Sequence, residues 1–173
     1  MDRMPCLRRK PLDGCGMPDV PRFYWDACVF LSYVNEDEDR VGDISSLLES
    51  AGKDEIEIVT STVSVVEVAF GAAERKQSAL SEEMEAKINK LWEPASPVTL
   101  VEFHILIAEA AKGMIRSGVP AGWSLKPMDA VHLATAQRLK VAEFHTYDGP
   151  LKKWASRVSY SIKEPSHSAP KLL

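Results

Sequence analysis

Four acidic residues stand where an α/β chain would bring functional groups together: Asp26, Glu67, Asp129 and Asp148. Two of them, Asp26 and Asp148, each directly follow a run of residues typical of a β-strand. The other two fall in the first turns of expected helices. In a parallel sheet the strands end, and the following helices begin, at the same edge, which is also where ligands bind. We therefore expect all four carboxylates to converge at that edge.

A cluster of carboxylates predicts a site for divalent cations. Like charges at close range raise one another's pKa values unless positive charge compensates for them, and oxygen ligands suit Mg²⁺ or Mn²⁺. Two such ions about 4 Å apart can activate a water molecule and stabilise the leaving oxygen in a phosphoryl displacement. These residue types therefore predict the chemistry of a nuclease or a phosphatase.

The two helical acids also have an ordinary structural interpretation. Ser64-x-x-Glu67 fits a capping box, in which the serine and the glutamate satisfy backbone N–H groups at a helix start. Asp129 follows Pro127 by two residues and fits a first-turn acid that interacts favourably with the helix dipole. For either residue alone, the structural and functional interpretations are equally good.

The two acids that follow strands differ in how easily structure alone explains them. Asp148 precedes Gly149-Pro150 and could be a turn residue. Asp26 lies between Trp25 and an apolar run, so its charge would be partly buried and needs a partner. One shared site explains the four acids better than four coincidences.

Histidine and basic side chains near the acids are candidates for supporting roles. His132 lies three positions after Asp129 and could help to position a phosphate or a water molecule, although a core histidine is the more common case. Lys126 precedes the same expected helix and could meet a phosphate at its start. Surface solvation explains most such bases, and the same holds for those that follow Asp148, namely Lys152, Lys153 and Arg157.

The elements that must position these residues alternate between strand and helix patterns, which indicates an α/β fold with a parallel sheet. Strands are expected over Arg22–Trp25, Glu55–Val59, Pro97–Leu100, Val141–Tyr147 and Val158–Ile162. Helices are expected over about Ala27–Val34, Val41–Ser50, Val63–Arg75, Ser81–Trp92, Glu102–Ser117 and Pro127–Lys140.

Length and charge set the domain organisation. A chain of 173 residues, 45% of them hydrophobic, can bury the core of one domain. We expect that domain over residues 22–163, with a proline-containing extension at 1–21 and a tail at 164–173. The net charge of −4 provides no general basic field for binding nucleic acid, but bound cations would add positive charge where a phosphate must sit.

Cysteine usage and hydropathy indicate a cytoplasmic protein. The three cysteines, Cys6, Cys15 and Cys28, share no C-x-x-C spacing, which favours a reduced chain. No stretch reaches the roughly 18 apolar residues of a membrane span, and the first residues lack the apolar core of a signal peptide. We therefore expect a soluble protein with no membrane partner.

Four segments, taken together and in order, resemble the acidic motifs of PIN domains, especially those of the small VapC-like toxins of bacteria and archaea. The segments are Tyr24–Leu31, Ser64–Glu67, Asp129–Ala136 and Thr146–Asp148. The acids follow one another at intervals of 41, 62 and 19 positions (67−26, 129−67 and 148−129). No single motif is specific, but the ordered set agrees with the family from about residue 22 to residue 162.

The resemblance implies a three-layer α/β/α fold with a central parallel sheet, and a Mg²⁺- or Mn²⁺-dependent endoribonuclease that cleaves single-stranded RNA. It implies that Asp26, Glu67 and Asp129 are metal ligands and that Asp148 completes the pocket or holds a second metal. It implies that Thr146 orients a ligand or a water molecule. It also implies a homodimer and inhibition by a cognate antitoxin protein, as in a toxin–antitoxin pair.

Two rival enzyme classes fit the sequence poorly. A phosphatase of the haloacid-dehalogenase type needs a second aspartate two positions after the first, where this chain has Cys28. A receiver domain needs paired acids after the first strand, and they are missing here. The alternative that stays open is a non-catalytic module with the PIN fold that binds RNA or another protein.

Overall fold

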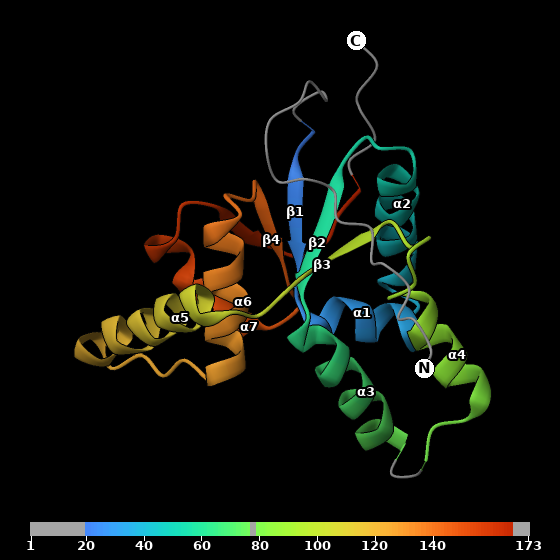
Figure 1. Ribbon diagram of the computed structural model, residues 1–173, viewed down its shortest axis with the longest axis horizontal. Coiled ribbons are helices and arrows are strands. Elements are labelled where there is room, and N and C mark those ends of the chain that lie inside the picture. The colour runs from blue at the N-terminus through green and yellow to red at the C-terminus, as the bar shows by residue number, and fades with distance from the viewer. Residues whose placement is uncertain (1–19, 77–78, 168–173) are drawn as a thin grey trace, which may run out of the picture.

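A five-stranded parallel sheet forms the centre of the protein in a computed structural model, which describes residues 20–76 and 79–167 (Figure 1). The strand order is β3-β2-β1-β4-β5, and every neighbouring pair is parallel. The strands are β1 (Arg22–Trp25), β2 (Glu57–Ser61), β3 (Val98–Val101), β4 (Glu143–His145) and β5 (Ser161–Lys163). The carboxyl ends of all five strands therefore share one edge, as expected.

Helices cover both faces of this sheet. They are α1 (Ala27–Val34), α2 (Val41–Gly52), α3 (Val63–Lys76), α4 (Glu82–Lys90), α5 (Ile105–Gly118), α6 (Pro127–Arg138) and α7 (Gly149–Lys152). Two short 3₁₀ helices are η1 (Val119–Ala121) and η2 (Lys153–Arg157). In Figure 1, α1 and α2 lie on one side of the sheet and α5 and α6 on the other. The expected three-layer α/β/α fold is confirmed.

Alternating side chains on the strands divide the core into two apolar clusters. Tyr24 of β1 and Val59 of β2 pack with α5 and α6. Their neighbours Trp25 and Ile58 point to the opposite face and pack with α1 to α4. Both faces of the central strands are thus buried, as is usual in parallel sheets. The residue after β1, Asp26, leaves this rigid core at the carboxyl edge.

Strand β2 begins two residues later than expected and continues through Thr60 and Ser61. These polar residues fit inside the sheet because they have hydrogen-bond partners there. The Thr60 hydroxyl donates to the carbonyl oxygen of Trp25 at 2.7 Å, and the Ser61 backbone N–H donates to the hydroxyl of Tyr24 at 3.0 Å. Hydropathy alone does not reveal such partners.

Five helices also differ from the expected bounds, α2, α3 and α4 by one or two residues at an end, and α5 and α6 for reasons that their ends show. Helix α5 begins at Ile105 rather than at Glu102, because His104 caps it by accepting a first-turn backbone N–H on its Nδ1. Helix α6 ends at Arg138 rather than at Lys140, which has a positive φ of 51° and so cannot continue a helix.

The last two strands are shorter than expected because of turns around them. Strand β4 covers three residues, and the chain turns after it at Thr146, whose hydroxyl accepts the backbone N–H of Asp148 at 2.9 Å. Helices α7 and η2, which the sequence pattern did not predict, then extend to Arg157. Strand β5 therefore begins at Ser161 rather than at Val158.

The first residues of the expected C-terminal tail contact the domain. Glu164 accepts a hydrogen bond from the Lys152 ammonium group at 2.7 Å, and the backbone N–H of His167 donates to Asp43 at 3.1 Å. The rest of that tail and nearly all of the expected N-terminal extension lie outside the described residues. None of the helices in the described ranges is long and apolar enough to cross a membrane.

Gly118 ends α5 at a position with no room for a side chain, and a substitution there tests the packing of α5. A Cβ atom would lie 2.8 Å from the ring of Trp154 and 3.1 Å from the carbonyl oxygen of Trp123. Because a backbone atom and a buried indole cannot move away easily, we expect Gly118→Ala to lower the free energy of unfolding by about 1–3 kcal/mol. Urea unfolding measures this change.

Gly113→Ala on the same helix is the matched control. A Cβ atom there would meet nothing within 4 Å. Alanine favours the helix over glycine, so we expect this variant to gain up to about 1 kcal/mol. If both variants shift the urea midpoint in the same direction and to the same extent, the packing described for Gly118 is wrong.

Candidate functional site

The four acids predicted from the sequence come from four separate connections of the fold. Asp26 directly follows β1, and Asp148 follows β4 by three residues, immediately before α7. Glu67 lies one turn into α3, which follows β2. Asp129 lies in the first turn of α6. The chain therefore brings acids from both ends of its sequence to the carboxyl edge of the sheet.

Contacts and charges show that these acids lie close to one another. The Nε2 atom of His132 is 2.6 Å from Oε2 of Glu67 and 3.7 Å from Oδ1 of Asp26. Burial raises the pKa of Asp129, and the charges of Asp26 and Asp148 raise it further, so both charges act on Asp129 at short range. The structure thus places Asp26, Glu67 and Asp129 around His132, with Asp148 close enough to Asp129 for their charges to interact.

Asp26 is the most enclosed of the four, with 8% of its surface exposed. Its Oδ2 atom accepts a hydrogen bond from the Thr146 hydroxyl at 2.7 Å and from the Cys28 thiol at 3.3 Å. The Thr146 hydroxyl also accepts the backbone N–H of Asp148, so one side chain ties two of the acids together. These bonds hold one oxygen of Asp26 and leave the other on the side of His132.

Among the four acids, Asp129 has a clearly raised pKa. Burial, followed by the charges of Asp26 and Asp148, raises its pKa to about 6. The positive charges of Lys126 and His132 oppose this rise without cancelling it. A carboxylate that resists ionisation this strongly would be stabilised by a nearby cation.

His132 is almost completely buried, with 1% of its surface exposed, yet it contacts a candidate metal ligand. Burial lowers its pKa, but the hydrogen bond to Glu67 and the charges of Asp26 and Glu67 outweigh burial, so the pKa of His132 lies above its usual value. His132 is therefore a core histidine by its location, the more common case, and its contacts link it to the acids as well.

The structure contradicts one of the ordinary structural roles expected for the acids and agrees with another. The capping box of Ser64 and Glu67 is wrong, because Ser64 lies inside α3 and its hydroxyl pairs with that of Thr60 at 2.7 Å. Asp148 stands at the start of α7 but its side chain forms no capping hydrogen bond. Asp129 does lie in a first helical turn, where its charge interacts with the helix dipole.

The basic residues that follow Asp148 have partners within the chain. Lys152 pairs with Glu164 at 2.7 Å. The Arg157 guanidinium lies over the ring of Trp123 at 4.7 Å from its centroid, and the Lys153 ammonium lies 5.9 Å from the same centroid. These contacts attach α7 and η2 to the rest of the domain, so a role in binding nucleic acid is not needed to explain them.

Oxygen atoms dominate the donor set, which fits Mg²⁺ or Mn²⁺. Within the described ranges, no three histidine, cysteine, aspartate or glutamate side chains are close enough together to hold one ion directly as they stand. Mg²⁺ usually keeps several of its water molecules and binds through only one or two carboxylates. The four acids therefore suit a hydrated ion better than a fully protein-coordinated one.

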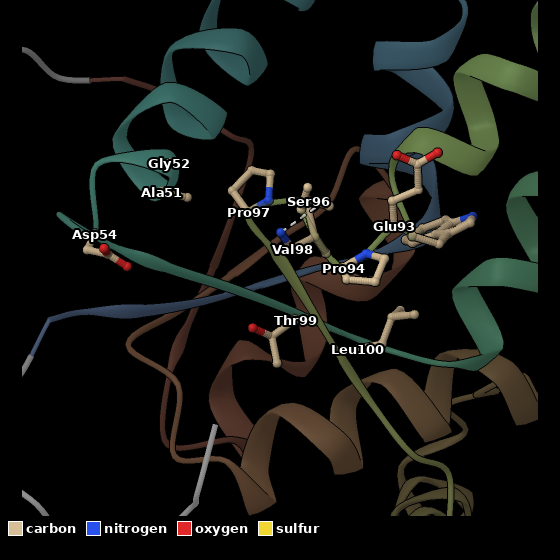
Figure 2. A pocket seen from close by; sticks show the side chains of 12 residues that line it. Ala51, Gly52, Asp54, Glu93, Pro94, Ser96, Pro97, Val98, Thr99 and Leu100 are labelled. Atoms are coloured by element: carbon tan, nitrogen blue, oxygen red, sulfur yellow. Dashed lines mark hydrogen bonds between the residues drawn. The ribbon is translucent and has the colours of Figure 1, made fainter. Parts of the chain in front are cut away.

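A recess on the described surface lies apart from these acids. Figure 2 shows this pocket of about 250 Å³, which is lined by the end of α2 and by residues 92–100 at the outer edge of the sheet. Its side chains include Pro94, Pro97 and Thr99, but none of the four acids. The acids also line no part of a second pocket, which includes Phe23 and Glu143.

Tyr24 is a residue near the site that the sequence pattern did not single out. Its hydroxyl lies 2.7 Å from Nδ1 of His132 and accepts the backbone N–H of Ser61. Complete burial raises its pKa well above the usual range. Strand alternation puts Tyr24 on the α6 side of the sheet two residues before Asp26, but no local signal indicates its contact with His132.

Comparisons with known proteins agree with this fold. The VapBC2 complex of Rickettsia felis, solved with a DNA fragment from its promoter, has a TM-score of 0.62 and 16% identity over 84% of this chain and 99% of that one. FitAcB from Neisseria gonorrhoeae has a TM-score of 0.59 and 17% identity over 83% and 97%. VapC20 of Mycobacterium tuberculosis, a toxin that cleaves the sarcin–ricin loop, has a TM-score of 0.58 and 14% identity over 73% and 90%. Identities this low establish a shared fold alone.

The sequence was also compared with curated proteins and with models of protein families. Comparison with curated proteins finds no match. The family model for the PIN domain, however, matches residues 23–156, a range that contains all four acids and most of the described domain. The resemblance noted in the four acidic motifs is therefore confirmed. This chain belongs to the PIN domain family.

Proposed function

We propose that this protein is a divalent-metal-dependent endoribonuclease that cleaves single-stranded RNA. The observation that carries the proposal is the convergence of Asp26, Glu67 and Asp129 around His132 in a PIN domain. The description of VapC20, a structural relative, as a toxin that cleaves the sarcin–ricin loop supports RNA as the substrate. The relatives in toxin–antitoxin complexes support a role as the toxin of such a pair.

Each site residue has a role in this proposal. Asp26, Glu67 and Asp129 hold Mg²⁺ or Mn²⁺, and Asp148 completes the pocket. The bound cation supplies a polarised water molecule and positive charge for the phosphodiester. Thr146 orients Asp26 through its hydrogen bond of 2.7 Å.

Positive charge for the RNA must come mainly from the site itself. The chain has a net charge of −4, so its overall field does not attract a polyanion. Lys126, which directly precedes α6 and whose charge acts on Asp129, is available to contact a backbone phosphate beside the cation. Binding of RNA should therefore depend on the divalent ion as well as on ionic strength.

Protein partners also follow from the proposal. We expect a cognate antitoxin, as in the complexes of the structural relatives, and a homodimer. Several large apolar side chains in the described part of the chain are more than half exposed and are candidates for such contacts: Val66, Phe70, Ile105, Leu106 and Val119.

A non-catalytic module that binds RNA or protein is the second candidate. In such a module the raised pKa of Asp129 would have no role. A nuclease, in contrast, needs a cluster of acids to bind its cation. The presence of all four acids favours catalysis.

Asp26→Asn tests the enzymatic proposal most simply, because it removes one charge and little volume. We expect cleavage of a mixed pool of transfer, ribosomal and messenger RNA in Mn²⁺ to fall at least about 100-fold, and to fall equally when wild-type protein is treated with a chelator. Gel analysis of end-labelled fragments measures the rate. Asp39→Asn is the control, because that side chain is 80% exposed. Wild-type rates in Asp26→Asn would contradict the proposal.

The raised pKa of Asp129 makes the metal-free protein sensitive to pH. An aspartate with a folded-state pKa of about 6 holds its proton more tightly in the folded state than in the unfolded state, where its pKa is near 3.8. The folded state is therefore favoured by low pH within this window, and the contribution of Asp129 to stability falls as pH rises from about 4 to about 6.

Asp129→Asn should remove this penalty. We expect the metal-free variant at pH 7 to gain about 1 kcal/mol in free energy of unfolding, a value discounted because the side chain is only half-buried. Glu83→Gln, which neutralises a first-turn acid of α4, is the matched control and should lose up to about 1 kcal/mol through the helix dipole. Urea unfolding in chelator at pH 5 and pH 7 measures both variants. A loss of stability in Asp129→Asn at pH 7 as large as that of Glu83→Gln would contradict the unfavourable ionisation of Asp129 in the folded state.

A further inference from the structure

We propose that His132, held in place by Tyr24, positions the carboxylate of Glu67 for cation binding. This inference rests on the proposed function, because it gives His132 a task at the same site. His132 acts through Glu67, so it is a positioning residue and not a catalytic one.

A chain of three hydrogen bonds leads from the sheet to Glu67. The backbone N–H of Ser61 donates to the Tyr24 hydroxyl at 3.0 Å, that hydroxyl lies 2.7 Å from Nδ1 of His132, and Nε2 of His132 lies 2.6 Å from Oε2 of Glu67. An ionised carboxylate only accepts hydrogen bonds, so Nε2 carries the hydrogen. In the neutral ring Nδ1 accepts from Tyr24, and in the protonated ring, which the raised pKa of His132 favours, Nδ1–H donates to the Tyr24 hydroxyl. In both states Nε2–H donates to Glu67, so the ring is held between Tyr24 and Glu67.

The Tyr24 and His132 side chains in this series of hydrogen bonds are rigid, whereas the Glu67 side chain is not. Tyr24 and His132 are both fully buried, with 0% and 1% of their surfaces exposed. The Tyr24 ring stacks on Phe144 at 5.1 Å between centroids and meets the His132 ring edge-on at 5.8 Å. The Glu67 side chain is 27% exposed and has three rotatable torsions. The hydrogen bond from His132 therefore fixes a flexible carboxylate to the core.

His132 also sets the distance between two candidate ligands. Its Nε2 atom lies between Glu67 and Asp26, 2.6 Å from an oxygen of the first and 3.7 Å from an oxygen of the second. Without this group, repulsion from Asp26 would turn Glu67 towards solvent. Since His132 follows Asp129 by one turn of α6, the same helix supplies one candidate ligand and positions another.

Two amide substitutions of His132 separate positioning from simple packing. The amide nitrogen of glutamine reaches roughly the position of Nε2, whereas that of asparagine reaches only the position of Nδ1. His132→Gln therefore keeps a donor for Glu67, and His132→Asn loses it. We expect His132→Asn to weaken Mn²⁺ binding about 10–100-fold and His132→Gln to stay within about threefold of wild type. Isothermal titration, checked by electron paramagnetic resonance of free Mn²⁺, measures the dissociation constant in the intact protein.

Two tyrosine substitutions test the anchor with smaller changes in volume. Tyr24→Phe removes the hydroxyl that holds His132, and we expect it to weaken Mn²⁺ binding about tenfold. Tyr160→Phe is the matched control, because its hydroxyl is also buried and donates to the Leu133 carbonyl on the same helix, α6, at 2.8 Å. We expect no change in Mn²⁺ affinity for Tyr160→Phe, even if both variants lose similar stability.

The outcomes distinguish this inference from the proposed function. If wild-type protein binds Mn²⁺ and Asp26→Asn does not, the metal site stands. In that case, equal affinities for His132→Asn and His132→Gln, or for Tyr24→Phe and Tyr160→Phe, overturn the positioning role alone. If wild type binds no Mn²⁺, or Asp26→Asn binds it equally well, the proposed function fails and this inference fails with it.

Discussion

Repulsion among carboxylates gathered at one edge of the sheet is the constraint on which the rest of the site depends. The parallel register fixes the direction of every strand, so Asp26 after β1 and Asp148 after β4 must emerge at the same edge. Burial, together with this crowding, raises the pKa of Asp129 to about 6 and so disfavours its ionisation. The hydrogen bonds from Thr146 to Asp26 and from His132 to Glu67 offset part of this repulsion. They do not supply the positive charge that would balance four carboxylates.

The division of the core into two faces explains how the site is held. Tyr24 and Trp25 are neighbours on β1, yet they belong to opposite clusters, so the strand that ends in Asp26 is anchored on both sides. On the α6 side, the turns that carry Asp129 and His132 are almost wholly buried from Ala130 to Ala136. Such a helix cannot rotate to relieve repulsion. Relief must come from protons, from hydrogen-bond donors or from a bound cation.

Much of this arrangement could be predicted from the sequence, because it depends on local patterns. The bounds of β1 and α1 agree with expectation, and Asp26 stands out as a charge between apolar segments. The contacts of Tyr24 with His132 could not be predicted, since they join residues 108 positions apart. The inclusion of Thr60 and Ser61 in β2 also depends on partners that only the tertiary structure brings together.

A crystal structure with Mn²⁺, recorded at a wavelength where manganese scatters anomalously, tests the central claim most directly. We expect an anomalous difference peak among Asp26, Glu67, Asp129 and Asp148, with oxygen atoms about 2.1 Å from the ion and several ordered water molecules completing its shell. A peak only at other residues, or no peak at a saturating Mn²⁺ concentration, would contradict the assignment of these acids as a cation site.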